Sequence, residues 1–179
     1  MTLRPFANRA TQQGKLVAAV ACGLLVATAV LADGEDPEAV VGTATVVDSD
    51  ILRVNDARIV LWGVESLERG QLCFIDGQPW ECYPAAVRAL ETIVGTAEIR
   101  CEPVGRADAF GRIFAVCYLG TDDINELFVL SGFGLARPAE TDAYVAAQEH
   151  AIAEGIGLWR SRFEPPAFIR ESSGTNDRP

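Results

Sequence analysis

Lysine, histidine and methionine are nearly missing from this sequence of 179 residues, in which each occurs once, as Lys15, His150 and Met1. A single histidine cannot supply a histidine-rich metal site, and it leaves little from which to build a catalytic dyad. No two cysteines are separated by two residues, so the usual half of a zinc-binding motif is also missing. These absences turn attention to carboxylates, arginines and disulfides.

The N-terminus has the organisation of an export signal. Three basic residues precede an uninterrupted apolar run at residues 16–31, and Val30 and Ala32 are small residues that predict cleavage after Ala32. The run is shorter than the roughly 20 residues of a spanning helix. We therefore expect residues 1–32 to be a signal peptide, with an uncleaved membrane anchor as the alternative. The protein is then periplasmic or extracellular, or held at the membrane by residues 16–31.

The predicted mature chain is strongly acidic. After residue 32 it has 12 arginines, no lysine and 25 acidic residues, which gives a formal charge of −13. Binding of nucleic acid normally relies on clustered Lys and Arg, and a field of this sign repels a polyanion. DNA or RNA is thus disfavoured as a partner, an unidentified protein is the other candidate, and membrane contact is expected only through the N-terminal segment.

Four cysteines follow residue 32: Cys73, Cys82, Cys101 and Cys117. An even number in an exported chain predicts two disulfides, for which three pairings are open, and a zinc site is the alternative. Cys101 and Cys117 lie nearly symmetrically about a loop centred near residue 109. In an antiparallel strand pair they would face one another at a separation that suits a disulfide. Cys73 and Cys82 would then close a second loop.

The order of predicted elements indicates a small barrel. An acidic linker at residues 33–39 precedes a meander of three short strands at 40–47, 51–54 and 58–62. A long polar loop at 65–83 leads to a helix from Pro84 to Gly95, and two strands follow at 97–102 and 112–119. Asp122 or Asp123 caps a helix that ends before Gly132, and another helix runs from Thr141 to near Gly155.

Five short strands with a helix after the third, and about three helices in all, predict one fold class. It is α+β, mainly β, with a five-stranded Greek-key barrel of the OB-fold type at residues 40–162. The composition of residues 163–179 predicts a disordered tail.

Four segments of this chain, taken in order, carry a family resemblance. They are Asp48-Ser49-Asp50-Ile51-Leu52, the stretch from Leu61 to Glu68, Asp108-Ala109-Phe110-Gly111-Arg112, and Asn125 to Gly132 with Gly155 to Trp159 beyond it. Their order and spacing resemble the staphylococcal nuclease (thermonuclease-like) family over about residues 40–161. The resemblance implies a five-stranded barrel with three helices, and calcium-dependent hydrolysis of phosphodiester bonds in DNA and RNA.

The resemblance also implies a Ca²⁺ site made of carboxylates. Asp48 and Asp50 match the family's acidic turn, and Glu65 stands where the family has an aspartate. Glu68 matches the glutamate that positions or deprotonates the attacking water. Clustered carboxylate oxygens suit a hard cation, which in turn polarises a phosphate. On residue type alone, Asp48 and Asp50 are better explained as ordinary turn residues.

The phosphate clamp is where the resemblance fails. The family uses two arginines, of which Arg112 matches one, whereas Val60 occupies the position of the other. The loss of one well-placed donor typically lowers the rate by about 10²–10³. Arg58 lies two residues before Val60 on the same strand face, about 6–7 Å away along the strand, and is the candidate substitute. Its position in the strand favours the role of an ordinary solvated residue over that of a substitute.

Two functions therefore remain open from the sequence. The first is a calcium-dependent nuclease with weakened activity, in which Asp48, Asp50 and Glu65 bind metal, Glu68 handles the water and Arg112 binds phosphate. The second is a catalytically inactive binding or structural module of the cell envelope.

Overall fold

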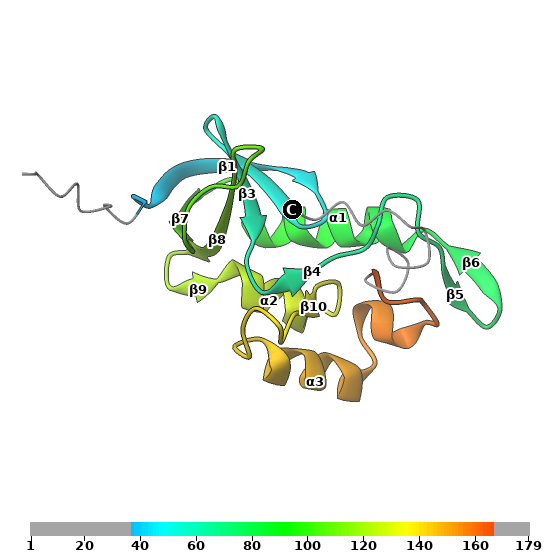
Figure 1. Ribbon diagram of the computed structural model, residues 1–179. Helices are drawn as coiled ribbons and strands as arrows, with labels where there is room; N and C mark the ends of the chain where they lie inside the picture. Colours follow the sequence, from blue (N-terminus) through cyan, green and yellow to red (C-terminus); the bar gives the residue numbers. More distant parts are fainter. Residues whose placement is uncertain (1–36, 167–179) are drawn as a thin grey trace, which may run out of the picture. The chain divides into compact units, whose positions relative to one another are not determined.

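The computed structural model describes residues 37–166, and their centre is a closed five-stranded barrel (Figure 1). Strands β1 (Val40–Asp48), β2 (Ile51–Val54) and β3 (Ala57–Leu61) form an antiparallel meander. Strands β7 (Glu98–Pro103) and β8 (Arg112–Leu119) form an antiparallel pair. β1 pairs with β7, and β3 runs parallel to β8, which closes the ring. This confirms the predicted barrel of the OB-fold type.

Helices cover the barrel and complete its core. α1 (Cys82–Val94) buries Ala86, Leu90 and Val94, which lie on one side of the helix at spacings of four residues. α2 (Ile124–Leu130) buries Phe128 and Val129, and α3 (Val145–Glu154) and the 3₁₀ helix η1 (Gly157–Arg160) follow it. Each fully buried large apolar side chain contributes roughly 1.5–3 kcal/mol, so this core is the main source of stability.

Buried Asn125 joins α2 to the barrel. Its side-chain amide donates to the carbonyl oxygens of Trp62 and Ala115 at 2.9 and 3.2 Å, and its carbonyl oxygen accepts from the backbone N–H of Cys117 at 3.1 Å. Three short strands lie close by: β4 (Val64–Glu65) pairs with β10 (Leu135–Ala136), and β9 (Asp122–Asp123) pairs with β8. The cap predicted for α2 is Asp123, whose carboxylate accepts from the N–H of Glu126.

The predicted loop at residues 65–83 is wrong in its second half, which contains a hairpin. Strands β5 (Cys73–Ile75) and β6 (Gln78–Trp80) pair across a turn at Asp76 and Gly77, which have φ angles of 51° and 78°. Asp-Gly with positive φ at both positions is a strong local signal for a two-residue hairpin turn. The polar composition of the segment concealed it.

Two helix starts also differ from the prediction. α1 begins at Cys82 rather than at Pro84, which still falls in the first turn, where its missing N–H costs nothing. α3 begins at Val145 rather than at Thr141, whose hydroxyl oxygen accepts from the N–H of Ala143 in a preceding turn. Gly155 ends α3 in the left-handed conformation, as expected.

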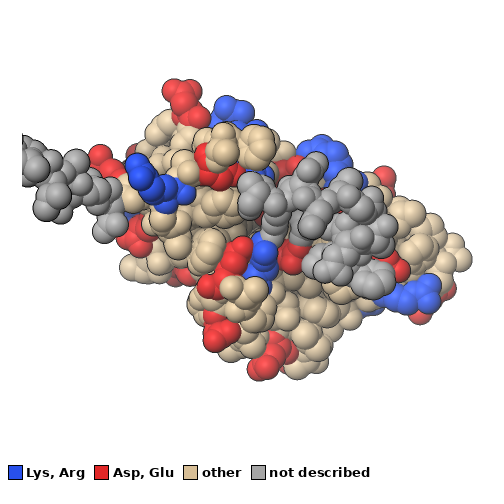
Figure 2. Space-filling view, viewed as in Figure 1, with Lys and Arg blue, Asp and Glu red and all other residues tan. Residues whose placement is uncertain are grey.

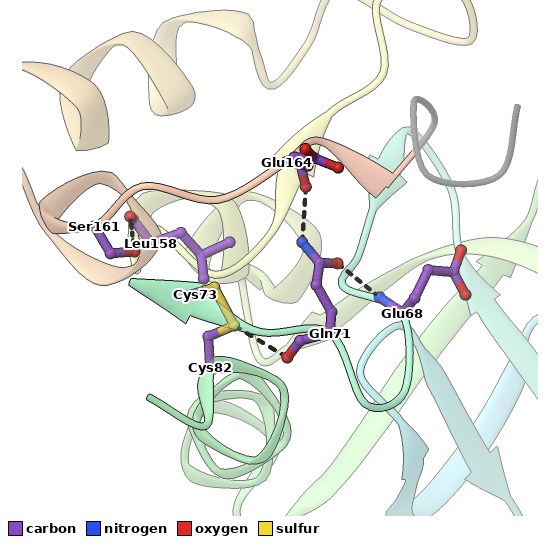
Figure 3. The surroundings of a disulfide bond; sticks show 7 residues. All are labelled: Glu68, Gln71, Cys73, Cys82, Leu158, Ser161 and Glu164. Carbon is purple, nitrogen blue, oxygen red and sulfur yellow. Dashed lines mark hydrogen bonds between the residues drawn. A yellow bond between two sulfur atoms is a disulfide. The ribbon is translucent and has the colours of Figure 1, made fainter. Parts of the chain in front are cut away.

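Both predicted disulfides are present, and the zinc alternative is wrong. Cys101 and Cys117 are directly opposite one another in β7 and β8, and Cys73 in β5 is bonded to Cys82 at the start of α1. Such bonds persist in oxidising compartments outside the cytoplasm. Figure 3 shows the surroundings of the second bond.

The packed chain continues beyond the expected domain end at residue 162. Phe163 stacks edge-on against Trp159 with ring centroids 5.3 Å apart, and the carbonyl oxygen of Glu164 accepts from the side-chain amide of Gln71 at 2.7 Å. The remainder of the predicted tail, the acidic linker up to residue 36 and the predicted signal or anchor lie outside the described residues. Within residues 37–166, no helix combines the length and apolar character needed to cross a membrane.

Candidate functional site

A buried serine ties the acidic turn between β1 and β2 to the segment that follows β4. The hydroxyl of Ser49 donates to the carbonyl oxygen of Leu67 at 3.0 Å, and the hydroxyl of Ser66 donates to Ser49 Oγ. Ser49 is only 1% exposed, so these bonds are shielded from water. The contacts hold the turn that carries Asp48 and Asp50 against the segment that carries Glu65 and Glu68. The sequence-predicted acids are therefore brought into one region.

Asp48 is held by donors from three parts of the chain. Tyr83 Oη donates to Oδ1 at 2.6 Å, the Ser49 N–H donates to the same oxygen at 2.9 Å, and Arg69 Nη2 donates to Oδ2 at 3.0 Å. Burial alone would raise the pKa of Asp48, but these hydrogen bonds and the charge of Arg69 outweigh it and lower the pKa. Asp48 is thus an ionised carboxylate whose two oxygens both accept protein hydrogen bonds.

Sequence reasoning missed Tyr83 and Arg69. Burial, together with the hydrogen bond to Asp48, raises the pKa of Tyr83 to about 12, so its hydroxyl remains a donor at neutral pH. The Arg69 guanidinium also lies 5.4 Å from the centroid of the Tyr83 ring. The two side chains therefore support one another as well as the carboxylate. Nothing in the local sequence pattern indicates a pairing over 35 residues.

Glu68 has the electrostatic character of a proton acceptor. Burial and the nearby negative charge of Asp48 raise the pKa of its carboxyl group. Its main chain is fixed by Gln71, because the Glu68 N–H donates to Gln71 Oε1 at 3.2 Å and the Gln71 N–H donates back to the Glu68 carbonyl oxygen at 3.0 Å. Figure 3 shows Gln71 between Glu68 and the backbone of Glu164. A carboxyl with a raised pKa in a polar site is a candidate general base.

Arg112 is positioned by the loop that precedes it. Its Nε donates to Asp108 Oδ2 at 2.7 Å, while Asp108 Oδ1 accepts from the N–H groups of Phe110 and Arg112, both at 2.9 Å. The Arg112 guanidinium lies 5.4 Å from the ring centroid of Phe110 and 6.0 Å from that of Phe114. Arg112 is therefore oriented by an ion pair with Asp108, the first residue of the segment 108–112.

Arg58 lies beside Arg112 on the outer face of the barrel. The two residues are register partners in the parallel β3–β8 pair, and Arg53 in β2 is the register partner of Arg58. Arg53 and Arg58 are exposed, and neither forms an ion pair within residues 37–166. Like charges directly opposite one another are unfavourable, so this row is a local concentration of positive charge. Arg53 was not anticipated, although strand alternation on both sides of the Asn55-Asp56 turn contains the signal.

Val60, at the position where the resemblance implies a second arginine, packs among apolar residues. It is 6% exposed, and its register partners are Ile51 in β2 and Phe114 in β8. Phe114 in turn meets the edge of Trp62 at a centroid separation of 6.2 Å. The cross-strand row of Val60 is therefore hydrophobic. A phosphate beside Val60 would find arginine donors only in the neighbouring row, at Arg58 and Arg112.

The acids that the resemblance assigns to a calcium site have the donor type that Ca²⁺ prefers. Carboxylate oxygens are suitable ligands, and Asp50 and Glu65 come from the two segments that Ser49 joins. Asp48 is committed to Tyr83 and Arg69. Across residues 37–166, no three side chains among Asp, Glu, His and Cys are grouped closely enough to hold one ion together. A bound cation would need backbone, water or phosphate oxygens in addition.

The charge on the visible face agrees with the acidic composition. In Figure 2, acidic side chains are spread over the barrel and the helices, and basic side chains occur singly among them. Among the described residues visible in this view, the basic side chains form no continuous surface of the kind that tracks a nucleic-acid backbone.

Comparison with known proteins gives one curated relative. No protein-family model matches the chain. The chain is 29% identical over 142 residues to the succinoglycan biosynthesis protein ExoI of Rhizobium meliloti (strain 1021), a match that covers 77% of this chain and 74% of the relative. The chain is thus similar, over most of its length, to a protein named for succinoglycan biosynthesis.

Proposed function

We propose that this chain is an exported protein of the staphylococcal nuclease type that hydrolyses phosphodiester bonds slowly in the presence of calcium. One observation carries the proposal: Ser49 joins the acidic turn to the segment of Glu68, a carboxyl with a raised pKa. Acids from two distant segments meet there, and one of them has the proton affinity that a general base requires.

Each residue has a separate task in this proposal. Glu68 accepts the proton of the attacking water. Asp50 and Glu65 would hold Ca²⁺, which when bound supplies Lewis-acid stabilisation of the phosphate charge. Arg112, oriented by Asp108, donates to the phosphate as a rigid fork. Asp48 acts as a positioning residue, because its oxygens accept hydrogen bonds from Tyr83 and Arg69.

Low efficiency follows from the clamp. Val60 offers no donor, and Arg58 begins one row further from the acids than the missing arginine would. A rate about 10²–10³ below that of a complete site is expected from the loss of one donor. The acidic surface reduces encounter with a polyanion further, most strongly at low ionic strength.

A second candidate function is a non-catalytic module of the cell envelope. The hydrogen bonds that Asp48 accepts from Tyr83, Arg69 and the Ser49 N–H favour this non-catalytic function. They give the Asp48 carboxylate a structural role in the acidic turn. The name of the relative from Rhizobium meliloti adds succinoglycan biosynthesis as the process in which such a module would serve.

The deciding experiment is hydrolysis of single-stranded DNA and RNA by the oxidised, purified protein, with calcium and with chelator. Glu68→Gln should abolish the calcium-dependent cleavage, and Glu91→Gln, which changes an exposed acid on α1, should leave it unchanged. Because ionised Glu68 is the base, the rate should rise with pH through an apparent pKa above 4.5.

Restoration of the clamp adds an independent test. Val60→Arg should raise the rate by roughly 10- to 100-fold, since it returns part of the lost donor effect. No calcium-dependent cleavage in the folded protein, with none in the Val60→Arg variant either, would reject the hydrolase and leave the non-catalytic module.

A further inference from the structure

The β5–β6 hairpin and the segment after α3 line an open cavity at the surface that contains none of the residues of the acidic site. Its volume is about 370 Å³, and its lining includes Phe74, Asp76, Trp159, Arg160, Ser161 and Arg162. In Figure 1 the hairpin projects beyond one end of α1, well away from the barrel. Sites for small molecules commonly have volumes of about 300–1,000 Å³. The cavity is therefore large enough for a ligand.

The walls of this cavity are fixed by covalent and backbone bonds. Phe74 and Arg162 exchange two backbone hydrogen bonds, at 2.9 and 2.8 Å, which add the C-terminal segment to the edge of the hairpin. The Cys73–Cys82 disulfide fastens the hairpin to α1. A ligand would therefore enter a preformed site and would not have to order it, which preserves binding free energy.

Two arginines of the lining lie over aromatic rings. The guanidinium of Arg160 lies 5.1 Å from the centroid of Trp80, and that of Arg162 lies 5.6 Å from the centroid of Phe74. Stacking orients the planar group and leaves N–H donors at its edge available to a carboxylate or a phosphate.

Neither of these arginines forms an ion pair with any acid in the described part of the chain, residues 37–166. The sequence contains 25 acidic and 15 basic residues, so carboxylates that could pair with these arginines are plentiful. The two arginines nevertheless line the cavity without an acidic partner among the described residues. Both residues line the cavity, so their charges favour an anionic group there.

The remaining lining residues suggest what is attached to that anion. Trp159 supplies apolar surface suited to the face of a sugar ring. The exposed carboxylate of Asp76 accepts hydrogen bonds from hydroxyl groups, and its charge opposes a ligand that is anionic over its whole length. We infer that this cavity binds a sugar that carries an anionic group, with Arg160 and Arg162 as the donors to its carboxylate or phosphate. The inference does not depend on hydrolysis at the acidic site.

Binding to the oxidised full-length protein tests the inference, by calorimetry and by the fluorescence of Trp80 and Trp159. The probes are a glucuronate-containing disaccharide, glucose 6-phosphate, a nucleoside 5′-monophosphate, glucose and inorganic phosphate. Binding of an anionic sugar at least tenfold tighter than that of glucose is expected. A preference for the uronate or for the phosphates identifies the source of the anion, and either preference supports the inference.

Variants locate the site. Arg160→Gln and Arg162→Gln should each weaken binding at least tenfold, whereas Arg106→Gln, at an exposed arginine of the β7–β8 loop, should not. Glu68→Gln should bind as the unaltered protein does, which separates this site from the proposed hydrolytic one. Near-ultraviolet circular dichroism verifies that each variant is folded.

Four results would overturn the inference. The first is no binding of any anionic sugar at millimolar concentration, and the second is equal binding of glucose. The third is binding that survives in folded Arg160→Gln and Arg162→Gln proteins. Inorganic phosphate that binds as tightly as the sugars would reduce the site to a simple anion site and would also reject it.

Discussion

Removal of the Tyr83 hydroxyl should destabilise the protein in a manner that depends on pH. Tyr83 donates to Asp48 at 2.6 Å, and a hydrogen bond to a charged group contributes about 1.5–3 kcal/mol. The Asp48 side chain is 30% exposed, so water replaces part of the lost bond. We expect Tyr83→Phe to lower the free energy of unfolding by about 1–2 kcal/mol at pH 7.

The pH dependence follows from the lowered pKa of Asp48. A carboxyl whose pKa is depressed in the folded state stabilises the protein above its unfolded pKa, which is 3.8 here, and this contribution is lost as the pH falls through the folded value. Tyr83→Phe returns the folded pKa towards 3.8 and removes part of that contribution. The difference between the two proteins should therefore shrink as the pH falls below about 4.

Urea unfolding with both disulfides intact, followed at pH 7, 5, 4 and 3, measures this difference. Tyr118→Phe is the matched control, because Tyr118 is also half-buried and its hydroxyl has no hydrogen-bond partner within residues 37–166. It should change the free energy of unfolding by less than about 0.5 kcal/mol. A loss in Tyr83→Phe that is equal at pH 7 and pH 3 would show that the hydroxyl does not act through the Asp48 carboxylate, and would refute the reasoning.

Three further substitutions test the framework around the site. Replacement of Cys101 and Cys117 by alanine should cost about 3 kcal/mol in urea unfolding, from the loop-closure entropy of a sequence separation of 16, and slightly more than loss of the hairpin disulfide with its separation of 9. Asn125→Ala should cost about 2–4 kcal/mol, because three backbone partners lose their bonds in a buried position. Gly132→Ala should lower the free energy of unfolding by about 1–3 kcal/mol, and with it the melting temperature by several degrees. The φ angle of Gly132 is +75°, and a Cβ would lie 2.4 Å from a carbonyl oxygen.

Each of these expectations has a clear contrary result. An equal or larger loss from the hairpin disulfide would contradict the loop-entropy argument. An Asn125→Ala protein as stable as the original would mean that α2 is not joined to the barrel through this side chain, and an unchanged melting temperature in Gly132→Ala would show that the close approach relaxes without cost.

The sequence determined the parts of this protein that depend on near neighbours along the chain. Strand alternation, turn residues and caps predicted the barrel, and the symmetry of Cys101 and Cys117 about their loop predicted the disulfide between them. The hairpin at Asp76 and Gly77 is also determined locally, because two adjacent residues specify its turn, although the sequence analysis predicts a loop there. The periodicity of apolar residues and the residue types of turns are local properties, so they can be recognised without knowledge of the fold.

Only the tertiary structure decided which side chains meet. The hydrogen bond between Tyr83 and Asp48 spans 35 residues, and the backbone pairing beside the cavity joins Phe74 to Arg162, which are far apart in the sequence. The row that places Arg58 beside Arg112 depends on the parallel register that closes the barrel. The resemblance named acids for the site, but the partners of Asp48 come from a loop and a helix whose placement follows from packing. Contacts of this range arise from burial of the whole core and not from local pattern, which is why the sequence names the residues but not their partners.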